Sequence, residues 1–129
     1  MNKNTLISIT ILLIALIASI FIFGSSTNNG SSEVPNTEIK NGVQYIRINA
    51  GGGYSPRISS AKAGIPTKLI MKTSGSFDCS SSLAIRSLGY QKILPQTGET
   101  EIDLGIPKAG EPLTGVCGMG MYNFTINFN

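Results

Sequence analysis

The hydrophobic residues of this chain follow one pattern near the N-terminus and another after residue 38. Residues 6–23 read LISITILLIALIASIFIF and carry no charge. At a rise of about 1.5 Å per residue, a helix of this length matches the roughly 30 Å hydrocarbon core of a bilayer. It lacks the polar face that a helix of a soluble domain needs. We therefore expect residues 1–23 to be a membrane anchor or signal segment, with one transmembrane helix over residues 6–23.

The flanks of this segment suggest an orientation. Lys3 precedes the apolar run, and the positive-inside rule then keeps the amino end in the cytoplasm. We expect a single-pass membrane protein with an extracytoplasmic C-terminal domain, at the cell surface or in the periplasm. A signal peptide has an apolar region of about 7–15 residues, shorter than this one. The small residues 24–26 nevertheless leave cleavage open.

Polar residues dominate the next stretch. Residues 24–38 read GSSTNNGSSEVPNTE, in which Val34 is the only large apolar residue. Such a segment cannot bury enough surface to offset the entropy lost on ordering. We expect a flexible Ser/Asn/Gly-rich linker here.

Alternation with a period of two sets in from residue 39. Short apolar runs are separated by Gly or Pro at intervals of about 8–12 residues, a pattern typical of sandwiches and barrels. No window keeps the i, i+3, i+4, i+7 stripe of an amphipathic helix. We predict an all-β Greek-key sandwich of about seven strands over residues 39–129. The runs that carry this prediction are 43–49, 57–61, 67–73, 83–86, 91–94, 100–104, 114–117 and 122–128.

The amino-acid composition excludes several classes of function. The chain has no His, which excludes Ser-His-Asp and Cys-His catalysis, HExxH zinc sites and the His₂Cys blue-copper centre. It offers no acid–base pair at a useful spacing and no nucleophile with a base, so we do not expect an enzyme. A net charge of +3 is too small to indicate a nucleic-acid partner.

Sulfur is concentrated in one glycine-spaced segment. In GVCGMGM at residues 115–121, Cys117, Met119 and Met121 alternate with single glycines. Glycine permits positive φ, so the backbone can bend until several side chains converge. The second thiol, Cys79, lies in a polar loop between two expected strands, beside Asp78. We expect Asp78 to order that loop by accepting hydrogen bonds from backbone N–H groups.

Three interpretations of the sulfur group are open. An even cysteine count in an oxidising compartment favours a Cys79–Cys117 disulfide, which leaves Met119 and Met121 unexplained. A soft-metal site would use thiolate and thioether ligands, which select Cu(I) over hard ions, whereas zinc usually takes four Cys or His. A thiol-redox pair would need a base or a CxxC motif, and the sequence has neither.

Several short motifs together resemble one known family. The chain resembles cupredoxin-like domains of the EfeO type, found in bacterial metal-handling membrane proteins, over residues 41–129. The motifs are GGYSP at 52–56, AGIP at 63–66, Cys79, LG at 88–89, LP at 94–95, Gly98, AG at 109–110 and CGMGM at 117–121.

This resemblance implies a cupredoxin sandwich with a metal site at one end. Cys79 falls at a mid-chain ligand position where blue-copper proteins carry histidine, and Cys117 falls at the cysteine of the C-terminal loop. Met119 and Met121 fall at the positions of the loop histidine and the axial methionine. The implied metal site is therefore Cys79, Cys117, Met119 and Met121, holding copper, as Cu(I), for storage or for transfer to a copper or heavy-metal transport protein.

Two alternatives stay open beside copper holding. One is a disulfide-stapled sandwich that serves as a structural or interaction module without metal. The other is an electron carrier with unusual copper ligation. The disulfide and the copper site also share one geometry, because cysteines close enough to bind one copper can form a bridge when copper is absent. The redox state would then control metal loading.

Overall fold

The computed structural model describes residues 2–23 and 35–129. The chain divides into two units, Met1–Glu33 and Val34–Asn129, and each is described by itself. The predicted linker falls largely outside the described residues. Its last two residues, Thr37 and Glu38, lie instead in the first strand of the β unit.

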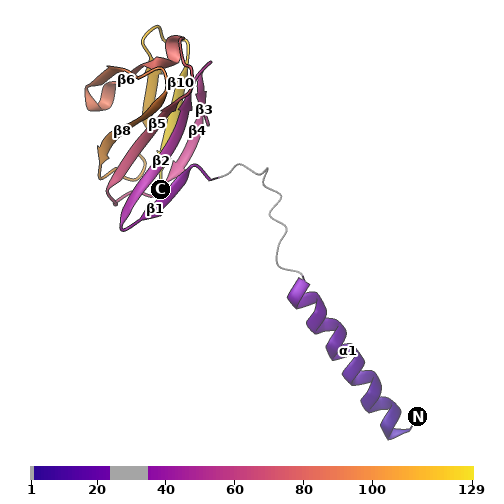
Figure 1. Ribbon diagram of the computed structural model, residues 1–129. Coiled ribbons are helices and arrows are strands. Elements are labelled where there is room, and N and C mark those ends of the chain that lie inside the picture. The colour runs from indigo at the N-terminus through magenta and orange to yellow at the C-terminus, as the bar shows by residue number, and fades with distance from the viewer. Residues whose placement is uncertain (1, 24–34) are drawn as a thin grey trace. The chain divides into compact units, whose positions relative to one another are not determined.

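A single helix, α1 (Lys3–Phe23), occupies the segment for which a transmembrane helix is predicted (Figure 1). Its large apolar side chains up to Ile17 are about half exposed or more. Among the described residues, no helix meets the length and apolarity needed to cross a membrane. The transmembrane helix predicted from the sequence is therefore not supported.

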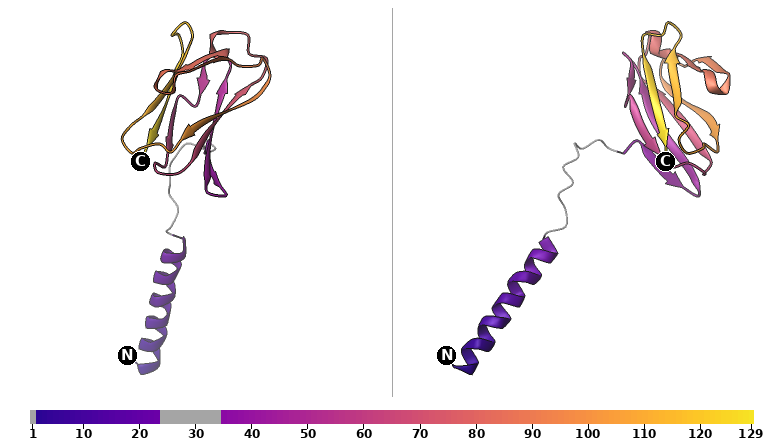
Figure 2. Two further views of the ribbon diagram at one scale, coloured as in Figure 1. Left: turned by 90° about the vertical axis from the view of Figure 1, so that its left-hand side faces the viewer. Right: turned by 180° about the vertical axis from the view of Figure 1, so that it is seen from behind.

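The β unit consists of two sheets, which lie as two layers in Figure 2. In the first sheet β2 and β5 are parallel, β1 and β8 form the outer strands, and β3 pairs with β2. This sheet contains β1 (Thr37–Lys40), β2 (Val43–Ala50), β3 (Tyr54–Ser55), β5 (Thr67–Thr73) and β8 (Gly98–Gly105).

The second sheet runs in the order β4-β10-β9-β6-β7. Strands β4 and β10 are parallel and the other neighbours are antiparallel. Its members are β4 (Ile58–Ala61), β6 (Ser82–Ile85), β7 (Tyr90–Ile93), β9 (Leu113–Cys117) and β10 (Asn123–Phe128). Two 3₁₀ turns, η1 (Cys79–Ser81) and η2 (Arg86–Leu88), flank β6.

The core lies between the sheets, on the faces that the alternation predicts. In β2, Ile46 and Ile48 are fully buried while Arg47 is exposed, because successive side chains of a strand point to opposite faces. Met71 in β5 is also fully buried. In β10 the inward face is formed by Phe124, Ile126 and Phe128.

The described part of the chain contains ten strands where about seven are predicted. Two of the additional strands are too short or too exposed to show alternation. β1 pairs only with β2 and is mostly exposed, so its residues need not alternate, and β3 has only two residues. Both are held by backbone pairing with β2, which periodicity cannot reveal.

One fully buried polar side chain interrupts the apolar face of β2. Nε2 of Gln44 donates to the carbonyl of Lys62 and to Oγ1 of Thr67, both at 3.0 Å. Its Oε1 accepts from the backbone N–H of Lys62 at 2.9 Å. The amide thus connects β2 to the segment between β4 and β5, and its polar atoms are satisfied despite full burial.

Candidate functional site

The two cysteines meet at one end of the sandwich. Cys79 and Cys117 form a disulfide, with Cα atoms 5.6 Å apart and 38 positions of sequence between them. Cys117 ends β9 and is 1% exposed, whereas Cys79 begins η1 and is only partly buried against the core. The disulfide interpretation, left open by the sequence, is thus the state that the structure contains.

Three backbone N–H groups of the segment after Cys117 approach the two sulfur atoms. The N–H of Met119 lies 3.4 Å from Sγ of Cys79. Those of Met121 and Tyr122 lie 3.2 and 3.4 Å from Sγ of Cys117. Residues 117–122, which we call the sulfur loop, therefore wrap around the bridge and direct N–H dipoles at it.

The methionines of the sulfur loop are largely exposed to solvent. Met119 is 78% exposed and Met121 is 63% exposed, which separates them sharply from the buried Met71. The structure thus brings together the backbone of both methionines and the sulfurs of both cysteines, while the methionine side chains extend into solvent. The four predicted ligands thus belong to one end of the β unit, where the two cysteine sulfurs are bonded to each other and the two methionines are exposed.

Two glycines shape the sulfur loop for different reasons. Gly120 has φ +72°, as expected of a glycine that permits a bend, and its N–H donates to the carbonyl of Cys117 at 2.8 Å. Gly118 has no positive φ. It instead lies against β6, where its N–H donates to the carbonyl of Ser82 and a Cβ would lie 2.6 Å from Oγ of Ser82.

Asp78 fixes the turn that carries Cys79. Its Oδ2 accepts from the N–H of Gly52 at 2.7 Å, and its Oδ1 accepts from the hydroxyl of Ser80. The hydrogen bond from Ser80 is the main reason that the pKa of Asp78 lies below its usual value, and the N–H of Gly52 adds to it. The prediction that Asp78 orders this loop through backbone N–H groups is confirmed.

Tyr54 supports the same turn from inside the sandwich. Its side chain is 5% exposed, its ring packs edge-on against Phe124 at 5.1 Å, and its hydroxyl donates to the carbonyl of Ser80 at 3.0 Å. Burial, together with the charge of Asp78, raises the pKa of Tyr54 to about 12. The hydroxyl therefore remains a hydrogen-bond donor at neutral pH.

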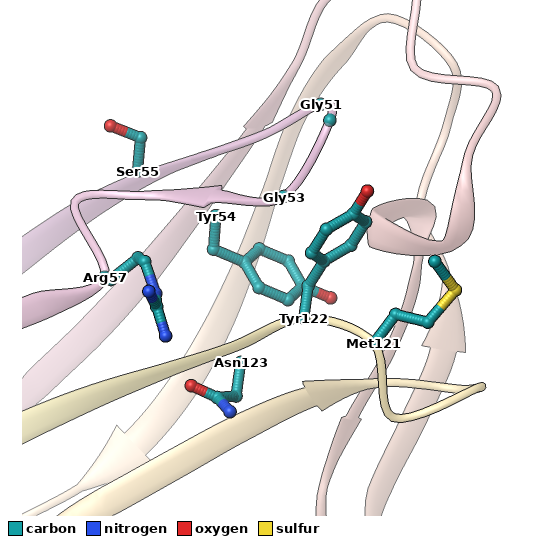
Figure 3. Close-up of a pocket in the computed structure, with 9 residues that line it drawn as sticks. Gly51, Gly53, Tyr54, Ser55, Arg57, Met121, Tyr122 and Asn123 are labelled. Atoms are coloured by element: carbon teal, nitrogen blue, oxygen red, sulfur yellow. The ribbon is translucent and has the colours of Figure 1, made fainter.

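A pocket of about 350 Å³ lies beside the sulfur loop and was not predicted from the sequence. Figure 3 shows Met121 at one end of it and Arg57 and Asn123 at the other. The triple glycine at 51–53 is the only sequence signal for it. Gly53 has φ +123° and brings the backbone to the ring of Tyr122, where a Cβ would lie 3.5 Å away.

Two solved structures that are 25% identical to this chain are copper-binding domains. One is the metal-binding domain of the Cu(I)-exporting P-type ATPase CopA of Streptococcus pneumoniae D39, with Cu(I) (TM-score 0.64). The match covers 78% of this chain and 99% of that domain. The other is a copper-binding protein in its apo form (TM-score 0.65), with 72% of this chain and 94% of that protein covered.

A more distant structure shares the fold alone. A chain of a heme-copper terminal oxidase dimer is 17% identical with a TM-score of 0.52, and the match covers 98% of this chain and 99% of that one. No protein-family profile matches the sequence, and no curated protein matches it significantly. The similar structures support a copper-related β fold, and they do not confirm a relationship to the EfeO type.

Proposed function

We propose that this protein binds copper as Cu(I), through Cys79, Cys117, Met119 and Met121, and holds it or passes it on. The observation that carries this proposal is the contact between Cys79 and Cys117, which are far apart in the sequence, at a loop that also bears two exposed methionines. The two copper-binding domains with the same architecture support it.

The chemistry of the donor set fits a soft ion. Reduction of the bridge would give two thiols at contact distance, and their thiolates favour Cu(I) over hard cations. The N–H groups of Met119, Met121 and Tyr122 already point at the sulfurs and would partly neutralise thiolate charge. Both methionines lie outside the hydrophobic core, and their exposure leaves room for the thioethers to turn toward the sulfurs.

Exposure of the thioethers suits transfer. A Cu(I) ion held by cysteine sulfur and flanked by Met119 and Met121 would be reachable by the thiols of a partner protein. Ligand exchange then moves the ion without any change in its oxidation state. A copper or heavy-metal transport protein is the class of partner that this exchange requires.

A second candidate function rests on the disulfide itself. The bridge cross-links η1 to β9 and so stabilises this end of the sandwich, as in a structural or interaction module that binds no metal. The two candidates differ in one measurable property, because only the copper protein needs the reduced form.

The location outside the cytoplasm also belongs to this proposal. A disulfide persists in oxidising compartments, which agrees with the predicted extracytoplasmic side. The uncharged run at 6–23 is the reason to retain membrane attachment as part of the proposal. Labelling of intact cells with an impermeant reagent, followed by membrane fractionation, tests both points.

Titration of the reduced full chain with Cu(I) against a competing chelator tests the copper proposal. We expect Cys117→Ser to cause a large loss of affinity and the double variant Met119→Leu/Met121→Leu a smaller loss. Met71→Leu serves as the matched control, since Met71 is buried in the core and should leave affinity unchanged. Equal affinity in all of these proteins would refute the copper site.

A further inference from the structure

The two sulfurs of the bridge differ in access and in hydrogen bonding. We propose that the bridge is opened at one defined atom: a thiolate attacks Sγ of Cys79, and Cys117 is the leaving group. Cys79 is then the site at which a small thiol or a dithiol reductant forms a mixed disulfide with this protein. The purpose of this step, release of the thiols for Cu(I), rests on the proposed function.

Access favours attack at Cys79. Thiol–disulfide exchange requires the incoming sulfur to reach the attacked sulfur from outside, so accessibility decides which of the two reacts. Cys117 is 1% exposed, lies at the end of the central strand β9 and is part of the core. Cys79 is partly exposed, begins a 3₁₀ turn, and lies two residues after Phe77, which is 78% exposed.

Hydrogen bonding favours departure of Cys117. The sulfur that leaves takes the electron pair of the S–S bond and becomes a thiolate, which N–H donors stabilise. Sγ of Cys117 has two such donors, the N–H groups of Met121 and Tyr122, at 3.2 and 3.4 Å. Sγ of Cys79 has one, the N–H of Met119 at 3.4 Å. Access and leaving-group stabilisation therefore both favour attack at Sγ of Cys79 with Cys117 as the leaving group.

The complete reaction balances with two equivalents of thiol. The first thiolate forms a bond to Sγ of Cys79 as the Cys79–Cys117 bond breaks and its electron pair moves to Cys117. A second thiolate attacks the small-thiol sulfur of the mixed disulfide and releases Cys79. The protein gains two electrons and two protons, and two thiols are oxidised to one disulfide. A dithiol reductant supplies both equivalents from one molecule.

The test uses the disulfide form of the full chain and a monothiol, glutathione. Brief exposure is stopped with acid, and the protein is then unfolded, alkylated and cleaved after Lys and Arg. The two cysteines fall on separate peptides, residues 73–86 and 109–129, so the position of glutathione can be read by mass spectrometry. We expect glutathione on the peptide of Cys79 and the alkyl group on the peptide of Cys117.

Two comparisons make the result decisive. The same reaction on urea-unfolded protein should lose most of the preference, because the preference comes from the fold. Glutathione mainly on Cys117, or an equal distribution in the folded protein, would overturn the inference. Either outcome is independent of copper: a protein that fails the Cu(I) titration can still open at Cys79, and one that binds Cu(I) can still open at Cys117.

Discussion

The backbone N–H of Met119 lies 3.4 Å from Sγ of Cys79, a residue forty positions earlier in the chain. This contact joins the sulfur loop to η1 independently of the covalent bond between Cys79 and Cys117. The end of the sandwich is therefore organised by backbone geometry as well as by the bridge. We expect the two cysteines to stay close after reduction, as a preformed site requires.

The exposed methionines should be the oxidation-sensitive part of the molecule. Peroxide adds oxygen to an accessible thioether, and the resulting sulfoxide is no longer a soft donor. We expect Met119 and Met121 to form sulfoxides well before Met71, which is fully buried. Peptide mapping separates them, because Met71 falls on residues 69–72 and the other two on 109–129. The oxidised protein should bind Cu(I) more weakly, and similar oxidation rates for all three residues would contradict the burial that we describe.

Substitution of Gly118 should destabilise the fold through one specific clash. A Cβ at this position would lie 2.6 Å from Oγ of Ser82, and that hydroxyl must turn aside, so Gly118→Ala should lower the free energy of unfolding by about 1 kcal/mol, the low end of the range for overpacking. Ser82→Ala removes that oxygen, and the remaining contacts, with Cβ and the carbonyl oxygen of Ser82, are 3.4 and 3.9 Å. The double variant should therefore recover part of the loss. Denaturant unfolding of all four proteins measures this coupling, and strictly additive effects would exclude the clash as the cause.

The buried amide of Gln44 should stabilise the folded protein. Gln44→Leu would leave the N–H and carbonyl of Lys62 without their side-chain partner, at a cost of about 1–3 kcal/mol for a buried unsatisfied group. Gln91→Leu is the matched control, since Gln91 is exposed on β7, and should change stability by less than about 0.5 kcal/mol. Thermal and urea unfolding give both values. Equal effects at the two sites would contradict the network.

Asp78 should make stability depend on pH in a defined direction. Because its pKa is lower in the folded protein than its ordinary value of 3.8, its carboxylate stabilises the fold above that value. This contribution disappears as the pH falls through the lowered pKa. Asp78→Asn should therefore lower the melting temperature at pH 7, and the difference from the parent protein should shrink in strong acid. A difference that stays constant from pH 7 to pH 2 would argue against the interaction, and Glu111→Gln provides an exposed control.

The sequence predicts those parts of the fold that depend on burial. The alternation around Ile46 and Ile48 appears in the structure, and so does the strand that contains Phe124 and Ile126. In each strand one face is buried in the core and the other faces water, which is the difference that the alternation records. Strand β1 could not be predicted, since backbone pairing with β2 holds it and its residues are largely exposed. Gln44 violates the pattern, because its partners come from a distant turn.

The candidate site was predictable to a similar extent. The motif CGMGM indicated that Cys117, Met119 and Met121 share one loop, and the even cysteine count left a bridge to Cys79 open as one of three interpretations. The packing of Gly118 on Ser82 could not be predicted, because no local pattern records the approach of a loop to a neighbouring strand. The exposure of both thioethers likewise depends on how the sulfur loop turns away from the core.

X-ray absorption of the selenomethionine-labelled, reduced full chain loaded with one equivalent of Cu(I) tests the central claim most directly. The copper edge reports the atoms bound to copper, and the selenium edge reports whether Met119 or Met121 is among them. We predict a copper shell made of sulfur and selenium alone, with the Cu–Se contribution lost in Met119→Leu/Met121→Leu and kept in Met71→Leu. A shell dominated by oxygen or nitrogen, or a chain that retains no copper, would contradict the account.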